Sequence, residues 1–294
     1  MAVRSWLFVP GDSEKKLAKA AAIGADAIIL DLEDSVAHAN KALARDLSAA
    51  WLGAHRQQVT GGRKLGRWVR INALDSRLWR DDLVAVMPGA PDGIMLPKSA
   101  GPESVQQLAA ELYELEGRNG IPAGSTRILP LVSETAHAAI TIPAYAAASL
   151  PRLAGLTWGA EDLSAAIGAT RKRDAAGEWT DAFRFARIQT LLTAHAKGVM
   201  ALDTLHADFA DEQGLRRAAE AARADGFAGM LAIHPAQVAV INQAFTPTEE
   251  ELEEARAIVS AFQASPDAGT LQIDRRMIDR PHLKLAQRLL GIEE

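Results

Sequence analysis

The chain has 294 residues, of which 48% are hydrophobic, and its 32 basic and 37 acidic side chains give a net charge of −5. This balance gives no reason to expect nucleic acid or an anionic membrane as a partner. The sequence lacks cysteine, which excludes disulfides, zinc–thiolate sites and cysteine nucleophiles. No apolar run approaches the roughly 18 residues of a membrane span, so we expect a cytoplasmic protein without a secretory leader.

Eight short apolar runs, each ending in turn or polar residues, predict the strands of one sheet. They lie at 5–10, 27–33, 67–72, 93–98, 127–134, 153–159, 199–204 and 230–235. Helix-like segments rich in Ala, Leu, Glu and Arg separate them, and such alternation indicates a parallel sheet. An open doubly wound sheet is the alternative, but a dinucleotide-binding turn would be glycine-rich where "VPGDSEKK" has one glycine. We therefore predict an α/β fold of the (β/α)8, or TIM-barrel, type.

About 50 residues after the eighth run fall outside the barrel count. Thr248 and Glu251 predict a capping box at the start of an added helix. A turn-rich, charged segment follows at 264–281, and "HLKLAQRLL" predicts a short final helix. We expect a barrel domain over 1–245 and a C-terminal helical extension over 246–294.

Polar residues collect at one end of the predicted strands. Seven of the eight runs end in or just before charged or titratable residues, which are Asp31, Glu33, Asp34, Arg70, Lys98, Glu134, Glu161, Asp162, Asp203 and His234. Active sites of βα barrels lie at the carboxyl ends of the strands. The sequence therefore predicts the functional site there.

The carboxylates predict a site for a hard cation. Side chains alternate along a strand, so Asp31 and Glu33 share a face and would point into the barrel mouth. Glu134 and Asp162 follow the fifth and sixth runs, and Mg²⁺ is usually held by one or two carboxylates. The alternative is that the acids form salt bridges with Arg70 and Lys98.

Three basic residue types offer weaker signals. The planar fork of Arg70 suits a substrate carboxylate or an oxyanion. Lys15 and Lys19 share one helix face and could meet the phosphates of a large cofactor, although spacing alone favours a solvated face. His234 could act as a base or a ligand, but a structural hydrogen bond is the commoner role for a lone histidine at a strand end.

A set of longer motifs resembles the citrate lyase β-subunit-like branch of the HpcH/HpaI aldolase family. The motifs run along nearly the whole chain: "LFVPGDSEKKLAKA", "AIILDLEDSV" followed by Lys41 and Arg45, "VRIN", "GIMLPK", "LVSET", "WGAEDLSAAIGATR", "ALDT", "AIHPAQVAVINQAFTP" and "MIDRPHLKLAQRLL". "LDLED" alone would be weak evidence, but all of these motifs in this order make the resemblance specific.

The resemblance implies a Mg²⁺-dependent lyase that cleaves or forms a carbon–carbon bond in a 3-hydroxyacyl-CoA, such as citramalyl-CoA or malyl-CoA, giving an acyl-CoA and a 2-oxo acid. By resemblance, Glu134 and Asp162 bind the metal and Arg70 contacts the reacting acid or enolate. Asp279 acts as acid/base from a neighbouring subunit, which implies an oligomer, usually a homotrimer, with the extension reaching across.

The remaining site residues follow from the same resemblance. Phe8, Lys15 and Lys19 match positions that contact coenzyme A, and Ile233 and His234 match a segment that lines its channel. Asp31 and Glu33 then surround the metal rather than bind it, accepting hydrogen bonds from metal-bound waters and holding Arg70 and Lys98 in place.

The sequence departs from the family in two places. "GMLAIHP" lacks a lysine that relatives often have before "AIHP", and the stretch before "MID" is short and lacks the usual glycine-rich run. Three alternatives therefore stay open: a free 2-oxo-acid aldolase without CoA, a citrate lyase β-subunit acting on an acyl-carrier-protein thioester, and a non-catalytic barrel that binds CoA or an acidic metabolite. The acyl group is not set by the sequence.

Overall fold

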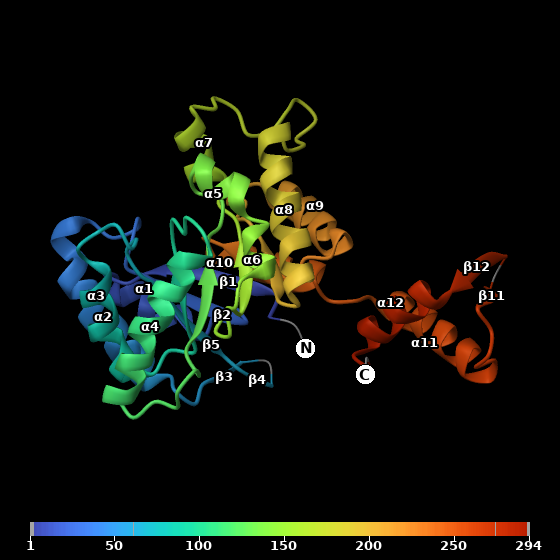
Figure 1. The fold of residues 1–294 in the computed structure, drawn as a ribbon, viewed down its shortest axis with the longest axis horizontal. Coiled ribbons are helices and arrows are strands. Elements are labelled where there is room, and N and C mark those ends of the chain that lie inside the picture. The colour runs from blue at the N-terminus through green and yellow to red at the C-terminus, as the bar shows by residue number, and fades with distance from the viewer. Residues whose placement is uncertain (1–2, 61, 274, 293–294) are drawn as a thin grey trace. The chain divides into compact units, whose positions relative to one another are not determined.

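A computed structural model describes residues 3–60, 62–273 and 275–292. The chain divides into two compact units, a barrel unit (Ala2–Gln243) and a C-terminal unit (Ala244–Glu294). Figure 1 labels their helices and strands. None of the helices within the described ranges is long and apolar enough to span a membrane.

Eight parallel strands form the barrel, and each corresponds to one of the eight predicted runs. They are β1 (Ser5–Pro10), β2 (Ala27–Asp31), β5 (Gly66–Arg70), β6 (Gly93–Leu96), β7 (Arg127–Pro130), β8 (Gly155–Thr157), β9 (Met200–Asp203) and β10 (Gly229–Ala232). They pair in the order β7-β6-β5-β2-β1-β10-β9-β8. Two parallel bridges, Ile128 to Leu153 and Leu131 to Thr157, join the two outer strands. The sheet therefore closes, and the predicted (β/α)8 barrel is confirmed.

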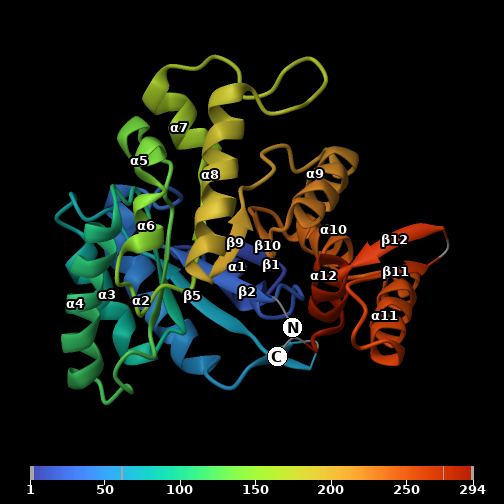
Figure 2. The same cartoon turned by 45° about the vertical axis from the view of Figure 1, so that its right-hand side comes forward.

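Helices surround the sheet (Figures 1 and 2). In chain order they are α1 (Glu14–Ala20), α2 (Lys41–Ala54), α3 (Trp79–Val86), α4 (Pro102–Arg118), α5 (Ala136–Thr141), α6 (Ala144–Ala147), α7 (Ala160–Ile167), α8 (Asp181–Lys197), α9 (Glu212–Asp225) and α10 (Pro235–Ala244). Short 3-10 turns, η1 (His38–Asn40) and η2 (Met87–Gly89), precede α2 and follow α3. A small hairpin of β3 (Val59–Thr60) and β4 (Arg63–Lys64) precedes β5, and the sequence did not predict it.

Large apolar side chains fill the inside of the barrel. Trp6, Ile29, Trp68, Met95 and Leu129 are all buried in one cluster, and the Trp6 and Trp68 rings meet edge to face at 4.9 Å. The inward positions of β2 are Ala27 and Ile29, so strand alternation makes Asp31 the next inward residue. The inward-facing side chains of β2 are therefore apolar up to its carboxyl end, where Asp31 places a carboxylate.

The C-terminal unit has its own apolar core. It comprises α11 (Glu249–Ala264), β11 (Thr270–Ile273), β12 (Arg276–Asp279) and α12 (Arg280–Leu290). Thr248 and Glu251 form the predicted capping box of α11. The segment expected to be only turn-rich forms an antiparallel hairpin, because Leu271, Ile273 and Ile278 pack against α11 and α12.

Gly93 tests how tightly the barrel interior is packed. A Cβ atom at this position would lie 2.2 Å from Cζ3 of Trp68. We expect Gly93→Ala to lower the free energy of unfolding by about 1–3 kcal/mol through overpacking, measured by urea denaturation. Gly117→Ala is the control, because its Cβ meets nothing within 4 Å. That change should raise stability by about 0.5–1 kcal/mol through helix propensity. Equal effects of the two changes would contradict this packing.

Candidate active site

A pocket of about 340 Å³ opens at the carboxyl end of the barrel strands. Its lining combines polar and apolar residues from six strands, the segments after them and the start of α7: Phe8, Arg70, Leu131, Glu134, Trp158, Gly159, Ala160, Glu161, Asp162, Thr204, Leu205 and Leu231. The pocket size suits a small organic acid rather than a large cofactor. The structure therefore brings together three of the predicted site residues, Arg70, Glu134 and Asp162, with Phe8 beside them.

Arg70 and Asp31 form a bidentate ion pair beneath the pocket. The two residues are register partners at the ends of β5 and β2. Arg70 Nε and Nη2 donate to the two Asp31 carboxylate oxygens, both at 2.7 Å. Asp31 is 1% exposed and also accepts the Glu33 and Ser35 N–H groups. Burial acts to raise the pKa of Asp31, but the Arg70 charge and these hydrogen bonds outweigh it, so the pKa lies below its ordinary value.

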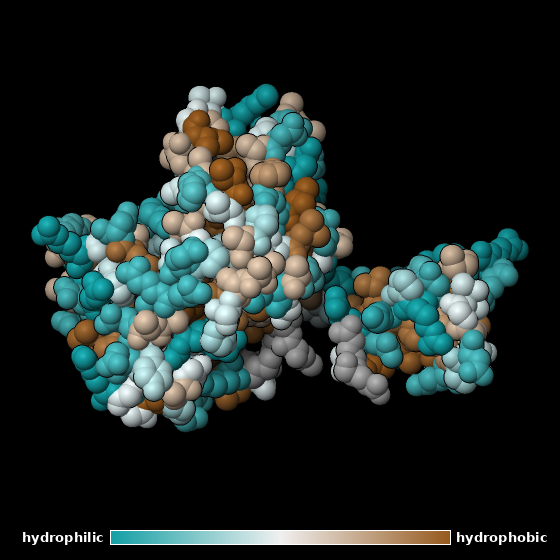
Figure 3. Space-filling view, viewed as in Figure 1, coloured by the Kyte–Doolittle hydropathy of each residue, from teal (hydrophilic) through white to brown (hydrophobic). Residues whose placement is uncertain are grey.

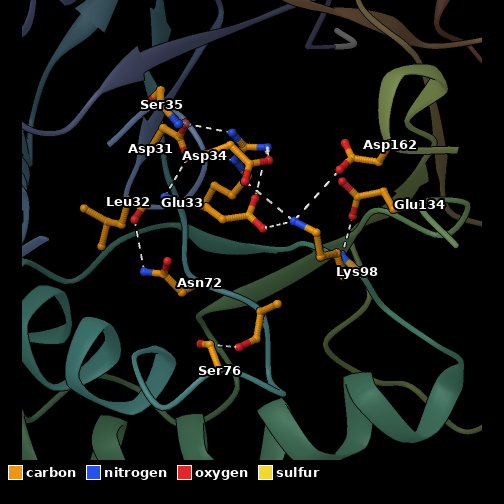
Figure 4. A network of polar contacts seen from close by, with 12 residues as sticks. Asp31, Leu32, Glu33, Asp34, Ser35, Asn72, Ser76, Lys98, Glu134 and Asp162 are labelled. Atoms are coloured by element: carbon orange, nitrogen blue, oxygen red, sulfur yellow. Dashed lines mark hydrogen bonds and ion pairs between the residues drawn. The ribbon is translucent and has the colours of Figure 1, made fainter. Parts of the chain in front are cut away.

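Glu33 lies between two cations (Figure 4). Lys98 Nζ is 2.5 Å from Glu33 Oε1, and Arg70 Nη1 is 3.2 Å from Glu33 Oε2. Burial raises the pKa of Glu33 despite both neighbours. The same two contacts help raise the pKa values of Arg70 and Lys98, against their own burial. The Asp34 side chain is 56% exposed, and its carboxylate lies within 4 Å of both cations.

Lys98 joins this cluster to the second pair of acids. Its φ of 50° is a left-handed conformation that a non-glycine residue rarely adopts. In this conformation its backbone N–H donates to Glu134 Oε2 while its side chain reaches Glu33. The ammonium is also 3.9 Å from Asp162 Oδ1. One strained residue therefore fixes the spacing between the two groups of carboxylates.

Two buried carboxylate oxygens of the site have no hydrogen-bond partner among the described residues: Glu134 Oε1, and Glu33 Oε2, which has only an ion-pair contact with Arg70. Glu134 is 3% exposed. Burial, together with the nearby charges of Asp162 and Glu33, raises the pKa of Glu134 to about 8. Gly159 keeps the space beside it open, since a Cβ there would lie 3.2 Å from Glu134 Cγ. A buried, unpaired carboxylate oxygen facing a pocket suits either a proton or a cation.

The donor set fits Mg²⁺ better than a transition metal. Among the described residues no group of three histidine, aspartate or glutamate side chains converges to hold a metal. Glu134 and the partly exposed Asp162 contribute two carboxylates to the same pocket. Magnesium keeps several waters and is usually bound through one or two carboxylates plus substrate oxygens. These two side chains could therefore hold a hydrated Mg²⁺ ion.

The other predicted residues lie around the mouth or in the other unit. Phe8 lines the pocket with the Arg70 guanidinium 4.7 Å above its ring. Lys15 and Lys19 are exposed on α1. Ile233 and His234 are exposed after β10, where Gln237 Oε1 accepts both backbone N–H groups.

Asp279 belongs to the C-terminal unit. It ends β12 and forms a capping box with His282, whose Nδ1 is 2.5 Å from Asp279 Oδ1. The hydrogen bond from His282 lowers the pKa of Asp279. Asp279 therefore belongs to a different unit from the residues that line the pocket.

Two features of the site were not predicted from the sequence. Lys41 Nζ donates to the backbone carbonyls of Leu32 and Glu33 at 2.6 and 2.7 Å, and Asn72 Nδ2 also donates to Leu32. These bonds fix the segment that carries the acids, and the only signal was the position of Lys41 after "AIILDLEDSV". The second feature is Trp158, which lines the pocket.

Fold and site together define a βα-barrel enzyme with an acidic cation site at the strand ends. Residues 4–235 match the family model described as HpcH/HpaI aldolase/citrate lyase. The chain belongs to this family, and it is an enzyme of the lyase class.

Individual relatives support the assignment over the full length. A citrate lyase subunit beta-like protein of Mycobacterium tuberculosis is 37% identical over 97% of this chain and 93% of its own length. The mitochondrial citramalyl-CoA lyase of Rattus norvegicus is 35% identical over 98% of this chain and 85% of its own length. The crystal structure of CitE from Mycobacterium tuberculosis in complex with magnesium, acetoacetate and coenzyme A matches with a TM-score of 0.76 and 36% identity, covering 99% of this chain and 98% of that one.

The raised pKa of Glu134 predicts a pH-dependent stability in the absence of metal. Between the ordinary glutamate pKa and about 8, the folded state binds a proton that the unfolded state has released. Stability should therefore fall as pH rises through this window, by up to about 1.4 kcal/mol per pH unit. The measurement is urea denaturation of the wild type and Glu134→Gln in a chelator from pH 5 to 9. A difference between the two proteins that does not vary with pH would contradict the raised pKa.

Proposed function

We propose that the protein is a Mg²⁺-dependent carbon–carbon lyase that cleaves, or forms, a 3-hydroxyacyl-CoA such as citramalyl-CoA or malyl-CoA. The observation that carries the proposal is the unpaired, buried Oε1 of Glu134 beside Asp162 and opposite Arg70, in a pocket of small-acid size. The related structure with magnesium, acetoacetate and coenzyme A and the related citramalyl-CoA lyase support the choice of ligands. The barrel unit serves as the catalytic domain in this proposal.

The metal is assigned to Glu134 and Asp162. When bound there, Mg²⁺ would supply Lewis-acid chemistry for the carbonyl and carboxylate oxygens of the 2-oxo acid. Asp31 and Glu33 are not needed as ligands, because their charges are already met by Arg70 and Lys98. Their role in the proposal is to fix these cations and to accept hydrogen bonds from metal-bound waters.

Arg70 stabilises negative charge as the bond breaks. A guanidinium has five N–H donors, and the hydrogen bonds to Asp31 use two of them, while Nη1 forms an ion pair with Glu33 at 3.2 Å. The remaining donors are free to bind the carboxylate of the substrate or the thioester oxygen as it gains charge. The contacts with Asp31 hold the guanidinium in one orientation before substrate arrives, which lowers the reorganisation needed in the transition state.

Asp279 of a neighbouring chain moves the proton. In the cleavage direction, Asp279 takes the proton from the hydroxyl on C3. The C2–C3 bond then breaks, and the electron pair of that bond forms the enolate of the thioester. The 2-oxo acid leaves, and the proton passes from Asp279 to the former C2, giving the acyl-CoA. The lowered pKa of Asp279 keeps it ionised near neutral pH, so it can accept the first proton.

The carrier portion of the thioester lies outside the small pocket. We assign Phe8, Lys15, Lys19, Ile233 and His234 to coenzyme A. The exposed amines of the two lysines would meet its phosphates. Gln237 supports this assignment, because it holds the backbone of Ile233 and His234 in one conformation.

A homotrimer would bring Asp279 into the pocket of a neighbouring subunit. Exposed apolar side chains on the barrel unit support burial against another copy: Ile140, Ile167, Phe185, Ile188 and Leu192 on α5, α7 and α8. Figure 3 shows apolar surface in this region. The trimer, the packing of the extension on a neighbour and a cytoplasmic location remain predictions.

A panel of thioesters tests the proposed activity. Malyl-, citramalyl- and citryl-CoA, and the citryl thioester of an acyl-carrier protein, are incubated with and without Mg²⁺ and the products are separated by chromatography. We expect an acyl-CoA and a 2-oxo acid from at least one CoA substrate, and no product in chelator. Turnover of free acids alone would favour a 2-oxo-acid aldolase. Turnover of the carrier-protein thioester alone would favour a citrate lyase β-subunit, and turnover of none would favour a non-catalytic binding protein. Free CoA with the intact hydroxy acid would indicate thioester hydrolysis instead.

Mixing two inactive variants tests the assignment of Asp279 to a neighbour. Asp279→Ala and Glu134→Gln should each lose most of the activity, by at least about 100-fold for an acid/base group. In mixed oligomers, some pockets combine an intact Glu134 with an intact Asp279 from the next chain. Co-refolded mixtures should therefore regain activity, whereas Glu134→Gln mixed with Asp162→Asn should not, because both changes fall in the same pocket. Activity of Asp279→Ala equal to wild type would rule the role out.

A further inference from the structure

Trp158 is a fully buried residue that forms one wall of the pocket. It follows β8, is 0% exposed, and lines the pocket together with Glu134 and Asp162. Leu131 and Leu205 are apolar neighbours in the same lining. Trp158 therefore belongs to the apolar part of the lining, which lies in the same pocket as the two carboxylates.

A buried ion pair fixes the indole. Trp158 Nε1 donates to Asp203 Oδ1 at 2.7 Å. Asp203 ends β9 and is 4% exposed, and its Oδ2 accepts from Arg187 Nε at 2.8 Å. Hydrogen bonds to an ionised acceptor are shorter and stronger than neutral ones. Asp203 Oδ1 also accepts the N–H of Thr204, another pocket residue.

The Arg187 guanidinium is itself held from two sides. Its Nη1 donates to Asp225 Oδ2 at 2.7 Å, and its carbon lies 4.6 Å from the centre of the Phe227 ring. On the other side of the indole, the Trp179 ring meets Trp158 edge to face at 5.1 Å. The orientation of the Trp158 side chain thus depends on residues from β9, α8, α9 and the segment before α8.

This arrangement exceeds what a buried indole requires. Trp6 and Trp51 satisfy their N–H groups with single backbone carbonyls, those of Val3 and Leu17. Neither of these tryptophans lines the pocket. Of these three tryptophans in the described part of the chain, the one that borders the pocket donates to a carboxylate that is paired with its own cation, and a buried ion pair is weak evidence for a role in stability.

We infer that Asp203 and Arg187 are positioning residues for Trp158, and that Trp158 determines which alkyl group the pocket accepts on the 2-oxo acid. The inference rests on the proposed function, which directs the carboxylate and carbonyl of the acid toward Glu134, Asp162 and Arg70. Its alkyl group then points to the apolar side, where the indole limits its size. A difference of one methylene in such a wall changes discrimination by about 10- to 200-fold.

Binding of two acids that differ by one methylene tests Trp158. Pyruvate and 2-oxobutyrate are titrated calorimetrically into the full chain with Mg²⁺. We expect Trp158→Phe, which has a smaller ring, to shift the ratio of the two dissociation constants toward 2-oxobutyrate by about tenfold. Trp6→Phe is the matched control, since it makes the same chemical change outside the pocket and should leave the ratio within about twofold.

A double-mutant comparison tests Asp203. Asp203→Asn should shift the ratio in the same direction in the wild type but cause no further shift in Trp158→Phe, where no indole N–H remains. An effect of the same size in both backgrounds would show that Asp203 acts only on the general structure and overturn its positioning role. Three results would overturn the inference about Trp158. They are an unchanged ratio of the two dissociation constants in Trp158→Phe, an equal shift of this ratio in Trp6→Phe, and no binding of either acid to the wild type.

The two proposals fail separately. A wild-type protein that binds both acids but cleaves none of the thioesters would refute the proposed function. The ratio of the acid affinities would still decide whether Trp158 sets the alkyl specificity.

Discussion

The bidentate pair between Arg70 and Asp31 is the interaction on which the site depends. It joins neighbouring strands at their register partners, with two bonds of 2.7 Å across a nearly dry contact. A guanidinium held this way keeps its charge and its orientation, so its remaining donors are fixed toward the pocket. The barrel interior supports the pair, because the inward positions of β2 run from Ala27 and Ile29 to Asp31.

The charges around this pair do not balance, and the imbalance supports the proposed metal site. Three buried carboxylates, Asp31, Glu33 and Glu134, face two cations, Arg70 and Lys98. The cations are engaged mainly with Asp31 and Glu33. Glu134 receives only a backbone N–H from Lys98 and keeps one buried oxygen without a partner among the described residues. Burying an unpaired carboxylate is costly, so Glu134 must bind a proton or a cation, and Asp162 makes the cation the better match.

The sequence predicted the barrel because its strands are continuous apolar runs of the right length and number. It also predicted that Asp31 and Glu33 share a face, since alternation along a strand is a geometric property of the backbone. The hairpins were missed for opposite reasons. The β3 and β4 strands have two residues each, too few for a pattern, whereas β11 and β12 have four residues each and lie in a segment rich in turn-forming and charged residues.

Other parts of the site could not have been read from residue types. The left-handed conformation of Lys98 is a property of the folded turn, yet it decides that one residue contacts both groups of acids. Residue types also cannot decide whether Asp31 and Glu33 form salt bridges or bind a metal. The distances show that both acids form ion pairs with Arg70 or Lys98. Trp158 could be separated from the other five tryptophans only through its partner Asp203 and its place in the pocket.

Calorimetric titration of Mg²⁺ into three proteins tests the central claim, that Glu134 and not the acid cluster binds the cation. Wild type, Glu134→Gln and Glu33→Gln are compared at pH 8.5, above the raised pKa of Glu134. The charge imbalance predicts that Glu134→Gln loses measurable binding, while Glu33→Gln still binds Mg²⁺ with an affinity about 10- to 100-fold below that of wild type, as is typical of residues that only orient a metal site. Intact binding in Glu134→Gln together with lost binding in Glu33→Gln would contradict it.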